Sequence, residues 1–302
     1  MPLAGRLIWG LTALALTVSA CGSSTPAVQA GPLKVVAGQN FWGSIATQLG
    51  GSRASVQSVV TDPNADPHEY ESNTNDARAI ADANFVILNG AGYDDWASRL
   101  LSANPSSHRT VLIAADLLGK KAGDNPHFWY NPDYVTRMAD QITADYKSID
   151  SADAAYFDQQ RADFTTALKP YTQRIAEIKA KFSGVPVGAT ESIFVYMATA
   201  LGLNLISPPE FMNAVAEGND PPAAAVITFQ NQITSKQVEV LVYNVQTATA
   251  VTTNIKHIAA LADIPVVGVS ETMQPESATF QDWQLSQLLA LQNALNASAL
   301  SS

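Results

Sequence analysis

The sequence predicts an α/β protein with two lobes, each a parallel-sheet α/β sandwich, joined by a long spine helix. Three observations predict this fold. Short apolar runs alternate with helical patterns in the first part of the chain and again in the last, which is typical of parallel sheets. Between the two parts lies one continuous helical pattern. We therefore expect an N-terminal lobe over residues 32–150, a linking helix over 151–182 and a C-terminal lobe over 183–302.

The first lobe is expected to contain four short apolar strands, at residues 33–38, 56–60, 85–88 and 110–114. A helix should open at Asn40, after the first strand. Another should cover residues 75–83, with Thr74 as its cap, because a threonine side chain can accept a hydrogen bond from the first free N–H groups.

The linking helix is predicted by apolar side chains spaced 7, 4, 3, 4, 3 and 4 residues apart. They are Phe157, Phe164, Leu168, Tyr171, Ile175, Ile178 and Phe182. This spacing places them on one helical face. A helix of about 28 residues would extend roughly 40 Å, the size of a lobe. Pro170 interrupts the stripe and could kink the helix. The alternative is two ordinary helices that meet at Pro170 within one domain.

The second lobe repeats the alternation of strands and helices. Strands are expected at residues 185–188, 238–243 and 265–269. Helices are expected over 192–201, ended by Gly202, over 248–262 and over 283–295. Residues 205–222 are rich in Pro, Asn and Gly, so we expect a loop there.

The beginning of the chain has the features of an export signal over residues 1–20. Arg6 precedes a short apolar run, and small residues then lead to the only cysteine, Cys21. This arrangement resembles the bacterial lipoprotein processing box, which implies cleavage before Cys21 and a lipid on its sulfur. The alternative is a plain secretory signal with an incidental cysteine. Residues 21–31 resemble a flexible tether, so we expect a protein anchored by lipid to the cell membrane on its extracytoplasmic face.

The composition excludes several classes of protein. The chain has 302 residues, 15% of them charged and 47% hydrophobic, which argues against disorder. It has 17 Lys+Arg against 27 Asp+Glu, a net charge of -10. We expect no nucleic-acid partner, because little would neutralise the phosphates. One cysteine excludes an internal disulfide or a cysteine-rich metal site.

Two Pro-His loops contain the candidate metal-binding residues. Asp66-Pro-His-Glu-Tyr-Glu follows a predicted strand, and Asn125-Pro-His-Phe-Trp-Tyr-Asn-Pro precedes a helix. Open α/β sheets bind ligands at the carboxyl ends of their strands, and imidazole is a common ligand of zinc and related metals. His68 and His127 are therefore candidate metal ligands. His108 and His257 lie in settings typical of surface histidines. Two imidazoles are an incomplete shell, so the second lobe should contribute.

The order of these motifs resembles the family 9 (cluster A-I) solute-binding proteins, which deliver zinc or manganese to ABC importers. The resemblance also includes Asn89-Gly-Ala-Gly-Tyr-Asp-Asp-Trp between the two Pro-His loops, and it extends from about residue 33 to 295. It implies four metal ligands: His68, His127, Glu191 and Glu271. The family usually has Asp at the last of these positions. It also implies an ABC permease as partner and binding rather than catalysis.

Two imidazoles and two carboxylates would neutralise one divalent cation. We expect zinc, with manganese as the alternative, because imidazole ligands and the affinity order of divalent metals favour zinc. Without metal, Glu191 and Glu271 would repel each other, so we expect metal to close the lobes. We expect a monomer. The competing functions are a surface adhesin with a structural metal and a metal-dependent hydrolase. The hydrolase is disfavoured because the sequence has no His-Glu-x-x-His motif.

Overall fold

The computed structural model describes residues 1, 31–64 and 66–300. The export signal, Cys21 and the tether up to residue 30 lie outside the described residues. The contacts within the chain divide it after Gly31, and the fold described below is that of the compact unit that begins at Pro32. Among the described residues, no helix is long and apolar enough to cross a membrane.

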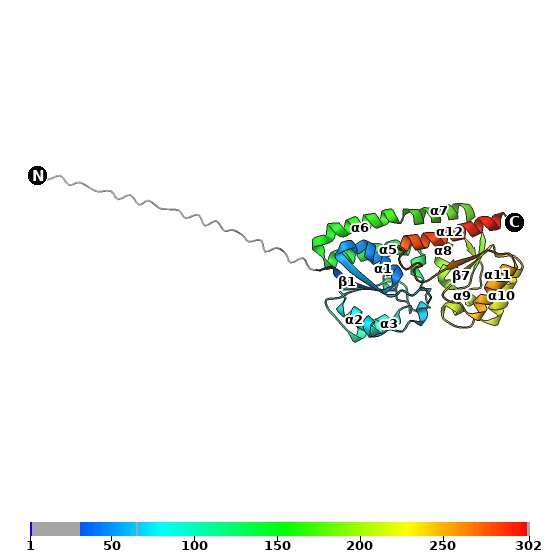
Figure 1. The fold of residues 1–302 in the computed structure, drawn as a ribbon, viewed down its shortest axis with the longest axis horizontal. Helices are drawn as coiled ribbons and strands as arrows, with labels where there is room; N and C mark the ends of the chain where they lie inside the picture. Colours follow the sequence, from blue (N-terminus) through cyan, green and yellow to red (C-terminus); the bar gives the residue numbers. More distant parts are fainter. Residues whose placement is uncertain (2–30, 65, 301–302) are drawn as a thin grey trace. The chain divides into compact units, whose positions relative to one another are not determined.

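The first sheet is parallel, with strand order β2-β1-β3-β4. Its strands are β1 (Leu33–Gln39), β2 (Ala54–Val60), β3 (Phe85–Leu88) and β4 (Thr110–Ile113). The helices of this part are α1 (Asn40–Gly50), α2 (Thr74–Asp82), α3 (Asp95–Ala103), α4 (Ala114–Leu118) and α5 (Pro132–Ile149). Short 3-10 turns are η1 (Gly51–Arg53), η2 (Pro67–Glu69) and η3 (Phe128–Tyr130). The predicted strands are confirmed (Figure 1).

The cap of α2 differs from the prediction. Asn73, not Thr74, is the N-cap: its side-chain oxygen accepts from the backbone N–H groups of Asn75 and Asp76. The Asp76 carboxylate in turn accepts from the backbone N–H of Asn73. Asparagine caps a helix at least as well as threonine, and here the reciprocal bond from Asp76 fixes the helix start one residue earlier.

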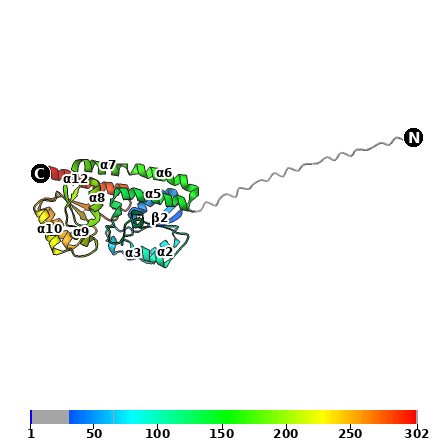
Figure 2. The same ribbon diagram turned by 180° about the vertical axis from the view of Figure 1, so that it is seen from behind.

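The second sheet is also parallel, with strand order β6-β5-β7-β8. Its strands are β5 (Pro186–Ala189), β6 (Asn204–Leu205), β7 (Val240–Asn244) and β8 (Val266–Val269). The surrounding helices are η5 (Ser192–Phe194), α8 (Val195–Leu201), α9 (Pro209–Ala216), α10 (Ala223–Thr234) and α11 (Ala250–Leu261). Figure 2 shows α9 and α10 within this second lobe, seen from behind.

The expectation of a loop over residues 205–222 was wrong. Helix α9 lies within that segment, because Phe211, Met212 and Val215 form a buried helical face. Pro209 occupies the first turn, where a missing N–H costs no helical hydrogen bond. The proline that suggested a loop is thus the start of a helix.

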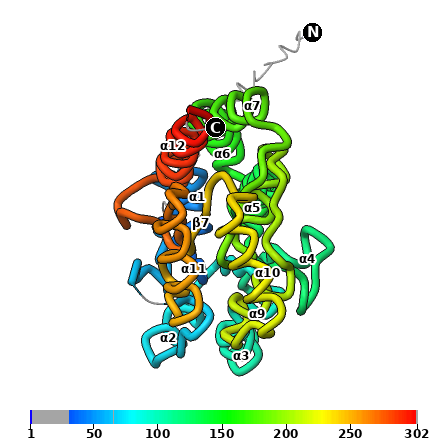
Figure 3. The backbone as a smooth tube through the Cα atoms, turned by 90° about the vertical axis from the view of Figure 1, so that its right-hand side faces the viewer, coloured from blue at the N-terminus to red at the C-terminus, as the bar shows by residue number. Residues whose placement is uncertain are grey.

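Residues 151–182 form a turn and two helices, and not the one continuous helix that the spacing predicted. The turn is η4 (Ser151–Asp153), and the helices are α6 (Ala154–Ala167) and α7 (Lys169–Phe182), with Leu168 between them. Pro170 lies in the first turn of α7 and cannot donate a backbone hydrogen bond, which accounts for the break. Helix α12 (Phe280–Ala299) packs beside α7, and together these helices extend over both sheets (Figures 1 and 3).

One apolar core continues from the first lobe into the second. It includes Phe41 and Trp129 of the first lobe, Tyr171 of the spine, and Val242 and Trp283 of the second part. Two smaller cores lie under α2 and α3 and under α9 to α11. Because interiors are packed at the density of organic crystals, this shared core opposes a wide separation of the two lobes.

Candidate metal centre

His68 lies in the turn η2, directly after β2. Asp66 accepts a hydrogen bond from the His68 backbone N–H at 2.9 Å, and Pro67 stiffens the first position of the turn. The ring of His68 meets the ring of Tyr93 edge-on, with centroids 4.7 Å apart. The side chain of His68 is 19% exposed. It is thus fixed in direction and still open to solvent.

His127 is buried, and Asn125 fixes the orientation and tautomer of its ring. The Asn125 side-chain oxygen lies 3.1 Å from the His127 backbone N and 2.7 Å from Nδ1 of the ring. Because an amide oxygen can only accept, Nδ1 carries a proton in this arrangement, and in the neutral ring Nε2 is the nitrogen left for a metal. Asn125 also donates to the Ser192 carbonyl at 2.7 Å, which connects the first lobe to the residue after Glu191.

The two predicted acids follow strands of the second sheet and are fully buried. Glu191 comes shortly after β5 and Glu271 shortly after β8. Glu271 Oε2 lies 3.2 Å from His68 Nε2 and 3.7 Å from His127 Nε2. Glu191 Oε1 lies 3.5 Å from His127 Nε2. The four side chains predicted from the sequence therefore meet in one place.

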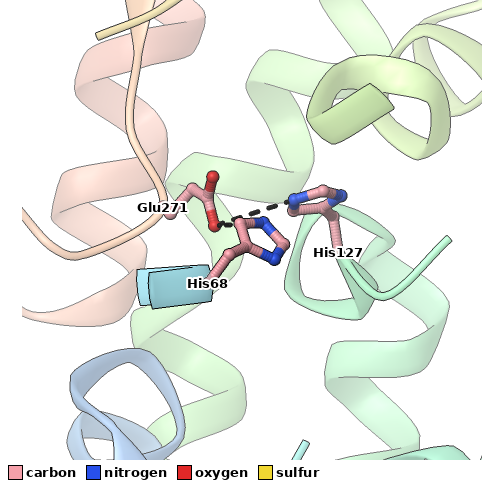
Figure 4. A group of neighbouring side chains, drawn as sticks. All are labelled: His68, His127 and Glu271. Carbon is pink, nitrogen blue, oxygen red and sulfur yellow. Dashed lines mark ion pairs between the residues drawn. The ribbon is translucent and has the colours of Figure 1, made fainter. Parts of the chain in front are cut away.

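Three of these four side chains have ligand atoms that lie especially close together. His68, His127 and Glu271 each offer one ligand atom within 4.8 Å of the others (Figure 4). Glu191 falls outside this tightest group and approaches it from the side of His127. His108 and His257 are exposed and do not belong to it.

Burial and ion pairing shift the pKa values of His68, Glu271 and Glu191 in different directions. Burial alone would lower the pKa of His68, but the facing Glu271 carboxylate raises it to about 9. Burial opposes the charged form of Glu271, yet His68 and His127 hold the pKa of that carboxyl well below its usual range. Burial raises the pKa of Glu191. The protein alone therefore holds a charged pair between His68 and Glu271.

Three neighbours that were not predicted as site residues hold these groups in position. Asn125 is one of them. Tyr93 donates its hydroxyl to Glu271 Oε2 at 2.6 Å. Asn244, the last residue of β7, donates from Nδ2 to both Glu191 and Glu271, at 2.8 and 2.9 Å. Tyr93 and Asn125 stand within the quoted motifs, whereas Asn244 had only its place at the end of a strand as a signal.

The Asn-Gly segment after β3 supports the first lobe's side of the cluster. The buried Asp94 carboxylate accepts from the backbone N–H groups of Asn89 and Gly90, at 2.6 and 2.8 Å. The Asn89 side chain donates to the Pro126 carbonyl at 2.9 Å. This segment therefore fixes both Tyr93 and the Pro-His turn that carries His127.

The donor set suits a divalent transition metal. Nε2 of His68 and Nε2 of His127 are buried and face carboxylate oxygens: that of His68 pairs with Glu271, and that of His127 lies 3.5 Å from Glu191 and 3.7 Å from Glu271. Two ring nitrogens that face carboxylate oxygens at 3.2 to 3.7 Å form a set of ligand atoms that one divalent cation could bridge. Two neutral imidazoles and two carboxylates would balance one such ion.

A cleft of about 700 Å³ connects His68 with the solvent. Its lining includes four acidic residues and neither lysine nor arginine. The acids are Asp66, Glu69, Asp124 and Glu217. Ser192 and Asn213 contribute from the second lobe, so the cleft lies between the lobes. An acidic entrance raises the local concentration of cations.

Known proteins share this fold and sequence pattern. Residues 35–294 match the family described as "ZnuA: Zinc-uptake complex component A periplasmic". A "Manganese ABC transporter substrate-binding lipoprotein PsaA" of Streptococcus anginosus is 25% identical over 215 residues, which cover 65% of this chain and 68% of that protein. The "Manganese-binding lipoprotein MntA" of Halalkalibacterium halodurans is 24% identical over 231 residues, 73% of this chain and 75% of that protein.

Solved structures show the same fold. A crystal structure of ZnuA superposes with a TM-score of 0.69 at 20% identity, covering 89% of this chain and 98% of that one. The solute-binding protein FpvC of P. aeruginosa, in complex with Ni²⁺, has a TM-score of 0.70 at 19% identity, covering 88% of this chain and 98% of that one. The two-lobe α/β prediction is thereby confirmed.

Proposed function

The chain belongs to the ZnuA family of zinc-uptake components, and on that premise we propose that it captures one divalent transition-metal ion between its lobes and delivers it to an ABC permease. The observation that carries this proposal is the convergence of His68, His127, Glu191 and Glu271 from both halves of the chain. The family is a transport component and not an enzyme, so the hydrolase alternative is dropped.

Zinc is the preferred cargo in this proposal. Two imidazole nitrogens and two carboxylate oxygens make a four-ligand set of the kind that zinc takes, and the affinity order of divalent metals places zinc above manganese. Manganese is the second candidate, because the relatives PsaA and MntA are named for it.

Capture requires the protein's own groups to change partners. His68 must give up its proton, while Asn125 keeps the proton of His127 on Nδ1 and leaves Nε2 for the ion. Glu191 and Glu271 supply the negative charge. We propose that the lobes over 32–150 and 183–302 close by modest rocking about the spine over 151–182, since the shared core opposes a wider motion.

Attachment to the membrane is proposed through Cys21. The support is the small residues that precede this cysteine and the word lipoprotein in the names of the relatives. Replacing Cys21 by Ser should release the protein from membranes into the soluble fraction. An unchanged membrane fraction would contradict the lipid anchor without affecting the metal proposal.

The test of function is metal analysis and chelator competition on the purified protein. We expect one zinc ion per chain, bound more tightly than manganese. His68→Ala should lower affinity by orders of magnitude, whereas His257→Ala, which removes an exposed histidine, should not. A reversed order of affinities would identify a manganese protein. Absence of stoichiometric binding of either metal, or unchanged binding in His68→Ala, would refute the site.

A further inference from the structure

Asn244 joins the two buried acids through a single side-chain nitrogen. It is 1% exposed, and Nδ2 donates to Glu191 Oε2 at 2.8 Å and to Glu271 Oε1 at 2.9 Å. An amide nitrogen has two hydrogens, so both are engaged.

The amide itself is held in one orientation. The Asn244 side-chain oxygen accepts from the Gln246 backbone N–H at 3.0 Å, so the nitrogen end must face the acids. The backbone N–H of Asn244 donates to the Thr190 hydroxyl at 3.2 Å. This side chain therefore has no freedom to follow the carboxylates if they turn.

The oxygens that face the imidazoles are the other two. Glu191 presents Oε1 to His127 at 3.5 Å, and Glu271 presents Oε2 to His68 at 3.2 Å. In both acids, one oxygen contacts the amide and the opposite oxygen contacts a ring. If either carboxylate turned to offer both oxygens to one ion, a buried Nδ2 hydrogen would lose its partner, which costs free energy.

We propose that Asn244 determines metal specificity by confining each carboxylate to one oxygen. The inference rests on the proposed function and goes beyond it. With one oxygen from each acid and one nitrogen from each imidazole, the cation has four protein ligands. This number suits zinc, which is tetrahedral in most protein sites, and disfavours manganese, which favours octahedral surroundings rich in oxygen.

The test compares zinc and manganese affinities of the full chain and two variants. Asn244→Leu keeps the branching of the side chain and removes its donor. Asn40→Leu is the matched control: Asn40 is also buried, and its oxygen accepts from Met273 N near Glu271, but it touches neither carboxylate. We expect the zinc-to-manganese preference to fall by about tenfold or more in Asn244→Leu and to stay unchanged in Asn40→Leu.

X-ray absorption on the zinc-loaded wild-type protein gives a second measurement, which can overturn the proposal even if Asn244→Leu does not fold. Four nitrogen or oxygen ligands at about 2.0 Å are expected. Five or six ligands would overturn the proposal, as would an unchanged affinity ratio in a folded Asn244→Leu that still binds one ion. A wild-type protein that binds neither metal would instead overturn the proposed function, and this inference with it.

Discussion

Substitution of Asn125 is the most direct test of whether the ring of His127 is oriented before metal binds. Its oxygen accepts from Nδ1 of His127 at 2.7 Å, and its nitrogen donates to the Ser192 carbonyl at 2.7 Å. Replacing it by Ala leaves a buried ring N–H without a partner, which costs about 1–3 kcal/mol. It also removes the constraint on the tautomer. Loss of such a partner lowers metal affinity by about 10–100-fold.

Asn131→Ala is the matched control. Asn131 also precedes a proline, and its oxygen accepts two backbone N–H groups, those of Asp133 and Tyr134. It caps α5 and touches no imidazole, so its loss should cost about 1 kcal/mol of stability with unchanged metal affinity. Asn125→Asp keeps an acceptor for Nδ1 but loses the donor to the Ser192 carbonyl, so it should restore only part of the affinity.

Chelator competition for zinc measures the affinities of these variants, and denaturant unfolding of the metal-free forms measures their stabilities. Wild-type affinity in Asn125→Ala, or an equal loss in Asn131→Ala, would refute the claim that Asn125 acts through the ring of His127.

Four further predictions concern protons, metal and the core. The pKa of His68 is raised to about 9 from 6.5, so a proton leaves as metal binds. Metal affinity should therefore rise with pH up to about 9, and calorimetry in buffers of different ionisation enthalpy should detect proton release. Absence of proton release near pH 7.5 would contradict this pKa. For the same reason, the contribution of the His68–Glu271 pair to metal-free stability should be complete only between about pH 4.5 and 6.5. It should be lost as pH rises through about 9 and should decline as pH falls below 4.5, as pH-dependent unfolding would show. Free zinc at about 100 times its dissociation constant should stabilise the fold by about 2.7 kcal/mol, and chelation should reverse this. Phe164→Ala in the spine, where the ring is 1% exposed, should cost about 3–5 kcal/mol by unfolding measurements with little change in metal affinity; a loss under 1 kcal/mol would argue against the packing described.

The fold was largely predictable because its determinants are local. Alternating apolar runs and helical spacing are properties of neighbouring residues, and the strands lie within a residue or two of their predicted positions. The prediction failed where one residue type serves two purposes. Pro209 begins a helix although proline also marks loops, and Asn73 caps α2 in place of the adjacent Thr74.

The candidate site was predictable only in part. His68 and His127 stand in distinctive Pro-His loops, whereas Glu191 and Glu271 were chosen by resemblance to a family. Asn244 could not be recognised, because its role depends on bringing residues 191, 244 and 271 together in space. The separation of these residues along the chain does not predict that contact. Tyr93 was visible as part of a motif, but its bond to Glu271 crosses between the lobes.

The central claim is that one metal ion is held between the two imidazoles and the two acids. Anomalous diffraction at the zinc absorption edge, on crystals of the zinc-loaded protein, tests it most directly. We predict one strong peak in contact with Nε2 of His68 and of His127 and with one oxygen each of Glu191 and Glu271. A peak elsewhere on the molecule, with these four side chains free of metal, would contradict the account.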